Sequence, residues 1–190
     1  MLSSKARILW IKWHAYLSCF FLPLALVYAL TGLLYLFDVK GGASQTFEYE
    51  FTTPLVFPLS EIQAQKLVTN FLSQDSTTRV HLPLPNNYYH SPEVQSWWDF
   101  NQEIILVNAH DGELPHLVIE KNNLWRQLIF IHKGLAGELF HVMGVLLGLS
   151  ILFSLLSGTL VALVMPKLKR NATLFISLGF VVVILAYGLS

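Results

Sequence analysis

Residues 139–166 read LFHVMGVLLGLSILFSLLSGTLVALVMP, a stretch that contains no Asp, Glu, Lys or Arg. Two similar charge-free runs flank it in the chain, one from Trp13 to Phe37 and one from Asn171 to Ser190. A helix needs about 20 mainly apolar residues to cross a hydrocarbon layer of about 30 Å, and each run is long enough. The first run is too long for the core of a signal peptide. The sequence therefore predicts three transmembrane helices.

The charged residues are distributed asymmetrically around these runs. All 12 acidic residues lie between Asp38 and Glu138, together with six basic residues, so this block carries a net charge of −6. The other basic residues lie before the first run and between the last two: Lys5, Arg7, Lys12, Lys167, Lys169 and Arg170. The positive-inside rule places the N-terminus in the cytoplasm, and the acidic block and the C-terminus on the outer side.

The acidic block has the composition of a small water-exposed α+β domain. Residues 60–72 have a helical spacing of apolar side chains, with Ser60 as a candidate N-cap and Gln63 three residues later. Trp97 to Val107 and Leu117 to Ile119 are predicted strands. The predicted parts are an N-terminal segment with the first helix (1–38), the α+β domain (39–125), an interfacial segment with the second helix (126–166), and a cytoplasmic link with the third helix (167–190).

A histidine lies in the second run on a helical stripe that also contains glycines. The following residues recur at intervals of three and four and therefore share one face of a helix: Gly137, His141, Gly144, Gly148, Ile151, Leu155 and Gly158. An ionisable residue at membrane depth indicates a functional site, and a neutral imidazole is a common axial ligand of haem iron. Glycines beside it would leave room for the porphyrin. The alternative is a G-x-x-x-G motif that only packs helices.

Two further histidines lie beside the predicted spans. His14 is near the inner end of the first span, and His132 precedes the second. If the chain from His132 to His141 is one helix, their side chains face opposite directions and lie about 13 Å apart along the axis. His14 lies near the inner surface, whereas His132 lies near the outer surface and His141 about 13 Å further in. We therefore do not expect one chain to bring His14 and His141 to the same iron. A haem site completed by a second copy is an alternative to two haems stacked across the membrane, and either arrangement favours a homodimer.

The acidic block offers a weaker candidate metal site. His110 and His116 flank the turn Asp111-Gly112-Glu113 and are candidate ligands for periplasmic iron, while His81 and His90 are isolated. Surface histidines are more often simply solvated. The single cysteine, Cys19, excludes a disulfide within one chain.

Several motifs resemble the PepSY-associated transmembrane family. These are Lys12-Trp13-His14-x-Tyr16, Ala29-Leu30-Thr31-Gly32, Ile131-His132-Lys133-Gly134 and residues 107–114, whose His110-Asp111 departs from the usual turn of a PepSY domain. The resemblance covers nearly the whole chain. It implies a bacterial inner-membrane protein with a periplasmic PepSY-like domain, similar to compact ferric reductases that hold haem b between transmembrane histidines. It places His14 and His132, but not His141, at motif histidines.

The expected function is a haem b ferric reductase. Electrons would pass from a cytoplasmic donor to periplasmic ferric iron or a ferric chelate, and the ferrous product would go to an importer. No nucleotide-binding motif occurs, so the predicted donor is an external reduced flavin or flavoprotein. One alternative is a non-enzymatic PepSY-like module that binds or regulates a partner. Another is iron chaperoning by the outer histidines. The expected surroundings are membrane lipid, and nucleic acid is not an expected partner, because the basic residues lie at predicted membrane edges.

Overall fold

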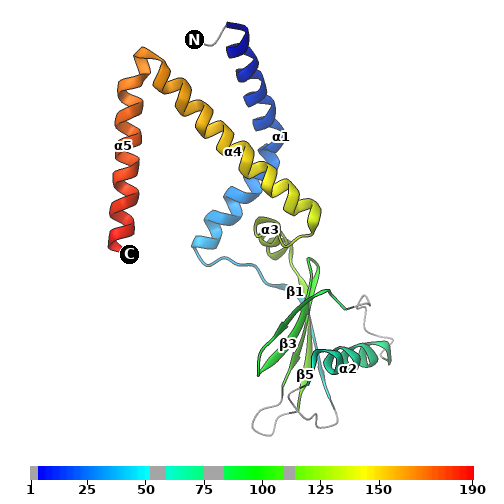
Figure 1. Ribbon diagram of the computed structural model, residues 1–190. Helices are drawn as coiled ribbons and strands as arrows, with labels where there is room; N and C mark the ends of the chain where they lie inside the picture. The colour runs from blue at the N-terminus through cyan, green and yellow to red at the C-terminus, as the bar shows by residue number, and fades with distance from the viewer. Residues whose placement is uncertain (1–3, 52–58, 75–83, 109–113) are drawn as a thin grey trace. The chain divides into compact units, whose positions relative to one another are not determined.

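The structure is a computed structural model that describes residues 4–51, 59–74, 84–108 and 114–190. Three helices in these ranges are long and apolar enough to span a membrane: α1 (Ser4–Leu36), α4 (Glu138–Val164) and α5 (Pro166–Leu189). Their side chains are largely exposed, as expected for helices whose apolar surfaces face lipid. The chain is therefore a membrane-spanning protein, as the charge-free runs predict (Figure 1).

The chain divides into two units, and the boundary between them falls within α1 and within α4. One unit comprises residues up to Ala25 and Val145–Ser190, and the other comprises Leu26–Gly144. The first unit contains the N-terminal part of α1, most of α4 and all of α5. Within it, the ring of Trp10 stacks on the ring of Phe153 with centroids 5.0 Å apart. Helix α5 begins at Pro166. The basic residues that were predicted to form a cytoplasmic link therefore belong to the start of this helix.

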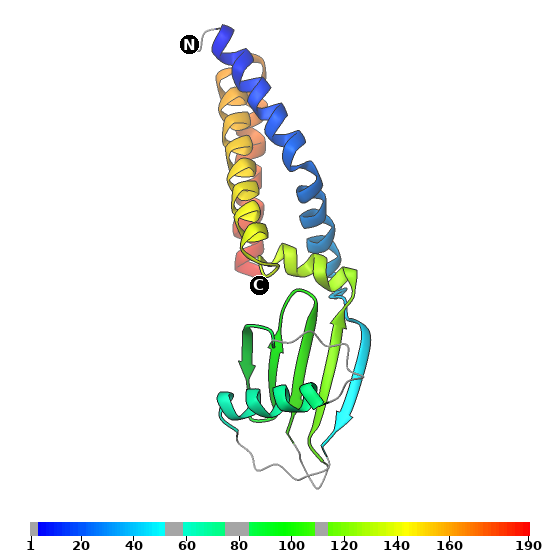
Figure 2. The same cartoon turned by 90° about the vertical axis from the view of Figure 1, so that its right-hand side faces the viewer.

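The second unit contains an antiparallel sheet, hereafter the sheet module, in the order β1-β5-β4-β3-β2. Its strands are β1 (Ala43–Glu50), β2 (Asn87–His90), β3 (Val94–Trp98), β4 (Gln102–Val107) and β5 (His116–Asn122). Helix α2 (Glu61–Gln74) covers one face, as Figure 2 shows. The core lies between them and includes Ala64 and Val68 from α2 and Ile104 and Ile119 from the sheet.

Local chemistry explains which predictions about this module are correct. Ser60 and Gln63 form the predicted capping box, because the Ser60 N–H donates to Gln63 Oε1 at 3.0 Å and the Gln63 N–H donates to Ser60 Oγ at 3.4 Å. Strand β5 confirms and extends the predicted strand at 117–119. The single strand predicted over 97–107 is wrong, because Asp99 Oδ1 accepts from the N–H groups of Asn101 and Gln102 and turns the chain into a β3–β4 hairpin.

A short helix, α3 (Leu124–His132), connects the sheet module to α4. It ends in a Schellman motif, in which the N–H of Leu135 donates to Phe130 O at 2.8 Å and the N–H of Gly134 donates to Ile131 O at 3.1 Å. Gly134 has a φ of 71°, in the left-handed region that glycine adopts without strain. A continuous helix from His132 to His141 is therefore not formed, and the axial separation that it would impose on the two histidines does not apply.

Candidate functional site

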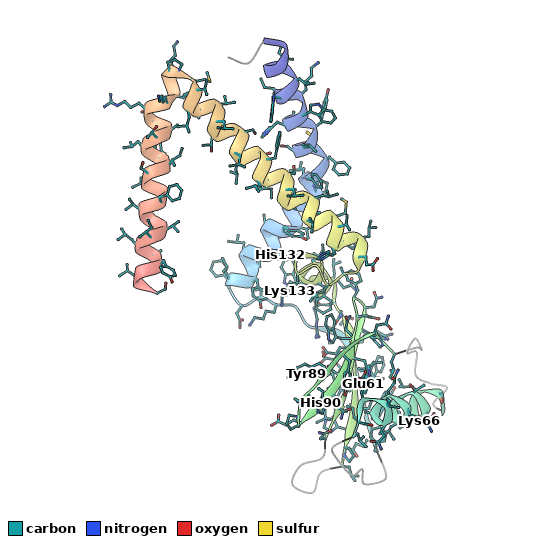
Figure 3. All side chains as sticks on the ribbon, in the orientation of Figure 1. Glu61, Lys66, Tyr89, His90, His132 and Lys133 are labelled. Atoms are coloured by element: carbon teal, nitrogen blue, oxygen red, sulfur yellow. The ribbon has the colours of Figure 1, made fainter. Side chains whose placement is uncertain are left out.

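His132 is the last residue of α3 and lies against the C-terminal part of α1 (Figure 3). Its Nδ1 is 2.8 Å from the hydroxyl oxygen of Thr31, a side chain that is only 1 % exposed. The same hydroxyl donates its single proton to Val27 O at 2.6 Å. This arrangement favours the tautomer in which the hydroxyl accepts from His132 Nδ1–H. The neutral imidazole then carries its free electron pair on Nε2, which has no hydrogen-bond partner among the described residues.

Small residues and an aromatic ring fix the orientation of this imidazole. A Cβ on Gly32 would lie 3.1 Å from His132 Cε1, so the absence of a side chain at this position leaves room for the ring. The ring of Tyr28 stacks on the imidazole with centroids 4.8 Å apart, and the Tyr28 hydroxyl donates to Ile131 O at 3.1 Å. The imidazole is therefore oriented by α1 through contacts at positions 28, 31 and 32, one turn of that helix.

Several contacts hold α3 beside the end of α1. Asn123 caps α3 by accepting from Arg126 N at 2.8 Å, and its own N–H donates to Gly42 O at 3.0 Å. The indole of Trp125 donates to Val39 O at 3.1 Å. Gly41 has a φ of 75°, and a Cβ there would overlap the backbone of Arg126. The chain that leaves α1 is thus bound to the first turn of the helix that carries His132.

An ion-pair network fastens α3 to the sheet module. Arg126 Nη1 donates to Glu120 Oε2 at 2.8 Å, and Nη2 contacts Glu103 Oε2. The side chains of Arg126, Glu103 and Glu120 are 21 %, 19 % and 28 % exposed, so solvent weakens these interactions less than it would at the surface. The edge-to-face contact of Trp98 with Phe130, at 5.6 Å between centroids, adds an apolar anchor. The position of His132 therefore depends on the sheet module as well as on α1.

His141 lies in the first turn of α4 and borders a hollow of about 500 Å³. Its ring rests on Gly134, where a Cβ would lie 3.1 Å from Nδ1. The hollow is lined by Asn87, Trp98, Gly134, Leu135, Gly137, Glu138, His141 and Val142. His141 is exposed. It thus occupies an open position at the junction of α4 with the sheet module.

The glycines predicted to flank a cofactor have different surroundings. A Cβ on Gly144 would overlap the Tyr28 hydroxyl, so the space left by this glycine is occupied by tyrosine. Nothing lies within 4 Å of the Cβ position of Gly148 or Gly158. Gly137, with a φ of 99°, lies before α4 and does not belong to its stripe. His14 lies in the other unit and is exposed.

The remaining histidines are not gathered into a metal site by the described residues. His116 Nε2 is 3.7 Å from Glu48 Oε1 across β1 and β5. His90 lies on strand β2, where its ring stacks on Tyr88 at 6.5 Å (Figure 3). His81 and His110, with the turn that follows His110, lie outside the described residues. No group of three or more potential metal ligands occurs in the described part of the chain.

Two lysines near the end of α1 have local partners. Lys40 pairs with Asp38, and that hydrogen bond raises the pKa of Lys40 above its usual value. Lys133 lies with its Nζ 5.0 Å from the centre of the Tyr35 ring. In the sheet module, burial raises the pKa of Tyr88.

His132 was predicted from the sequence as a candidate ligand, but the contacts that orient its ring were not. Thr31 and Gly32 were singled out as a motif, whereas Tyr28 and the hollow beside His141 were missed. Thr31 and His132 are 101 residues apart. A single sequence contains no signal that joins them, and only the pairing of a polar threonine with a glycine inside an apolar helix marks the position as unusual.

Comparison with known proteins shows one family. The family model described as "PepSY-associated TM region" matches residues 1–164, which include the first two candidate membrane helices and the whole sheet module. No curated protein and no solved structure matches the chain.

Proposed function

We propose that this chain, which belongs to the PepSY-associated transmembrane region family, is a haem b ferric reductase of the compact VciB type. It resides in a bacterial inner membrane with its N-terminus in the cytoplasm and a periplasmic PepSY-like domain formed by the sheet module. It takes electrons from a reduced flavin or flavoprotein and delivers them to periplasmic ferric iron, and a ferrous iron importer takes up the product.

One observation carries the proposal: His132 Nδ1 contacts the buried Thr31 hydroxyl, and this contact favours the tautomer whose unprotonated Nε2 can bind a metal. Metal-bound histidines usually donate their other ring N–H to a protein acceptor, which sets the tautomer and the orientation. Thr31 supplies that acceptor at 2.8 Å, and Gly32 leaves room for the ring. The residues present therefore fit the axial ligation of haem iron.

The position of the site suits electron delivery to the outer side. Thr31 lies five residues before α1 ends at Leu36. At 1.5 Å per residue this is about 7.5 Å from the end of the helix. A haem bound at His132 supplies one-electron redox chemistry close to the membrane surface, and the surrounding helices tune its potential through burial. His132 would bind the iron, Thr31 would accept from its Nδ1–H, and Tyr28 stacks on the ring and orients it.

His14 is proposed as a further haem ligand. It lies near the opposite end of α1 from Thr31, so it serves either a second haem or a site completed by the other copy of a homodimer. The glycine stripe of α4 gives His141 less support as a ligand, because Tyr28 fills the space at Gly144.

The test is an absorption spectrum of the detergent-purified full chain before and after dithionite. We expect a Soret band with sharp α and β bands in the reduced protein, and reoxidation when ferric nitrilotriacetate is added. We expect His132→Ala to lose most of the haem. The matched control is His116→Ala, which removes a histidine of the sheet module and should retain it. A chain without a Soret band, even when haem is supplied during expression, contradicts the proposal and favours a partner-binding module. Full haem content in His132→Ala contradicts the assignment of the ligand.

A further inference from the structure

Two lysines lie over one tyrosine ring where α1 reaches the end of its candidate membrane span. Tyr35 immediately precedes Leu36, at which that span ends. The Nζ of Lys133 is 5.0 Å from the centre of the Tyr35 ring, and the Nζ of Lys40 is 5.7 Å from it. The three residues belong to the second unit, and Lys133 lies beside the end of α1 (Figure 3). Two ammonium groups are thus held at one ring by cation–π attraction.

The two ammonium groups differ in how far their charge is neutralised. Lys40 pairs with Asp38, whereas Lys133 forms no ion pair with the described residues. Arg126 of α3 is already paired with two carboxylates of the sheet module. A contact with a ring face does not cancel the charge of a cation. The cluster therefore retains the charge of Lys133 for an anionic ligand.

Positive charge at this position contrasts with the acidic block around it. Residues 38–138 contain 12 acidic and six basic residues, a net charge of −6, and such a block as a whole repels anions. Lys121 makes a similar contact with Phe47, at 5.6 Å from its ring centre, but on the strands β5 and β1. The cluster at Tyr35 differs because it lies at the end of a membrane helix.

The apolar surroundings indicate that the anion is the headgroup of a lipid. Leu36 and Phe37 follow Tyr35 directly and are 81 % and 72 % exposed. Acyl chains would cover these side chains, whereas a free phosphate ion would leave them in water. Tyrosine and tryptophan favour the headgroup level of a membrane, and Trp125 is bound here through its indole N–H to Val39 O at 3.1 Å. Basic side chains at this level attract anionic phospholipids.

We propose that Lys133, together with Lys40, binds the phosphate of an anionic phospholipid in the leaflet next to the sheet module. Lys133 supplies the main charge, Asp38 competes for Lys40, and Tyr35 keeps both lysines at the level of the headgroups. Lys133 directly follows His132 at the end of α3, so the lipid fastens this end of the helix to the membrane surface. The inference requires neither haem nor electron transfer.

The test is hydrogen–deuterium exchange of the full chain in detergent, because the basic residues of the first unit also attract anionic lipid and a local readout is needed. The readout is the slowed exchange of the amides of residues 129–136, at the end of α3 and in the turn after it. Phosphatidylglycerol and phosphatidylcholine with the same acyl chains are compared, since both contain a phosphate but only the first has a net negative charge. We expect half-maximal protection at about fivefold less phosphatidylglycerol, the ratio for one unit-charge contact at about 4 Å in water.

A soluble anion separates a lipid headgroup from free phosphate. Glycerol phosphate has the same charged group without acyl chains, and it should give no protection at the concentration at which phosphatidylglycerol saturates. Protection by glycerol phosphate at that concentration would overturn the inference. Equal protection by the two lipids, or protection by neither, would do the same.

Variants locate the site at Lys133. Lys133→Gln should raise the concentration of phosphatidylglycerol for half-maximal protection by about fivefold, and Lys133→Arg should leave it unchanged. The matched control is Lys121→Gln, which removes the same charge from a lysine that also lies over an aromatic ring, and it should have no effect. Equal effects of Lys133→Gln and Lys121→Gln would contradict the proposed site.

Asp38→Asn tests the part of Lys40. Asp38 has a φ of 62°, a conformation that Asn also adopts, so the backbone is kept while the competing carboxylate is lost. The released Lys40 should then tighten the binding of phosphatidylglycerol by about fivefold. An unchanged or weaker affinity would remove Lys40 from the site and overturn the proposed pair of lysines.

Discussion

Replacing Thr31 with Val tests whether the buried hydroxyl prepares His132 for iron. Valine keeps the shape of the threonine side chain but cannot accept the Nδ1–H bond of 2.8 Å. A buried donor left without a partner costs about 1–3 kcal/mol. The imidazole can avoid this cost by moving its proton to Nε2, and that tautomer does not bind iron through Nε2. We therefore expect haem affinity to fall.

The expected loss follows from the size of that cost. Removing a hydrogen-bond partner of a metal-bound histidine typically lowers metal affinity by about 10- to 100-fold. This corresponds to about 1.4–2.8 kcal/mol, the same range as the cost of the unpaired donor. The hydrogen bond also raises the basicity of the imidazole and so favours the ferric state. Its loss should raise the midpoint potential, by about 59 mV for each tenfold loss of affinity that is confined to the ferric form.

The assay is a haem titration of the apoprotein in detergent, followed at the Soret band, together with a redox titration of the loaded protein. Thr31→Ser is the matched variant, because it keeps the hydroxyl and removes only a methyl group. We expect Ser to remain close to the original protein in both measurements. Wild-type affinity and potential in Thr31→Val would refute the reasoning. So would a Ser variant as impaired as Val, because shape and not the hydroxyl would then orient the ring.

Two further predictions concern how His132 and His141 are positioned. Gly134→Ala should lower the midpoint of thermal unfolding by several degrees, because a left-handed φ of 71° costs a residue with a Cβ about 1–2 kcal/mol and the new atom would crowd the His141 ring. Gly148→Ala is the control, because open space surrounds that position, and it should unfold at the midpoint of the original protein. Equal midpoints for the two variants in circular dichroism would contradict this account. Arg126→Met should cost about 1–3 kcal/mol by leaving two poorly exposed carboxylates without their partner. Changing both of those carboxylates to Gln as well should recover much of the thermal stability, and no recovery would mean that the charges are not the cause.

The membrane helices and α2 were predictable because their signals are local. Charge-free runs of sufficient length, a helical spacing of apolar residues and a capping box at Ser60 each depend on neighbours within one element. The β3–β4 hairpin was not predicted because its turn depends on one side chain, Asp99, that accepts two backbone N–H groups. The apolar strands on both sides of this turn look continuous in the sequence. The break between α3 and α4 was not predicted either, because nothing in the apolar sequence marks it. Gly134 was interpreted as part of a helical segment, and Gly137 as part of the glycine stripe of the second span.

The sequence alone determined that the chain spans a membrane and that an acidic α+β domain interrupts its helices, and it placed His132 in a stretch that resembles a family motif. These properties follow from composition, from periodicity along the chain and from the match of short motifs. Only the tertiary structure brings His132 Nδ1 to a hydroxyl 101 residues away. That contact favours the tautomer with a free Nε2, because the hydroxyl already donates its proton to a backbone carbonyl. The tertiary structure also decided that Tyr28 fills the space beside Gly144 and that His141 faces a hollow. Hydrogen-bond direction and packing space are relations between distant segments, and folding alone brings those segments together.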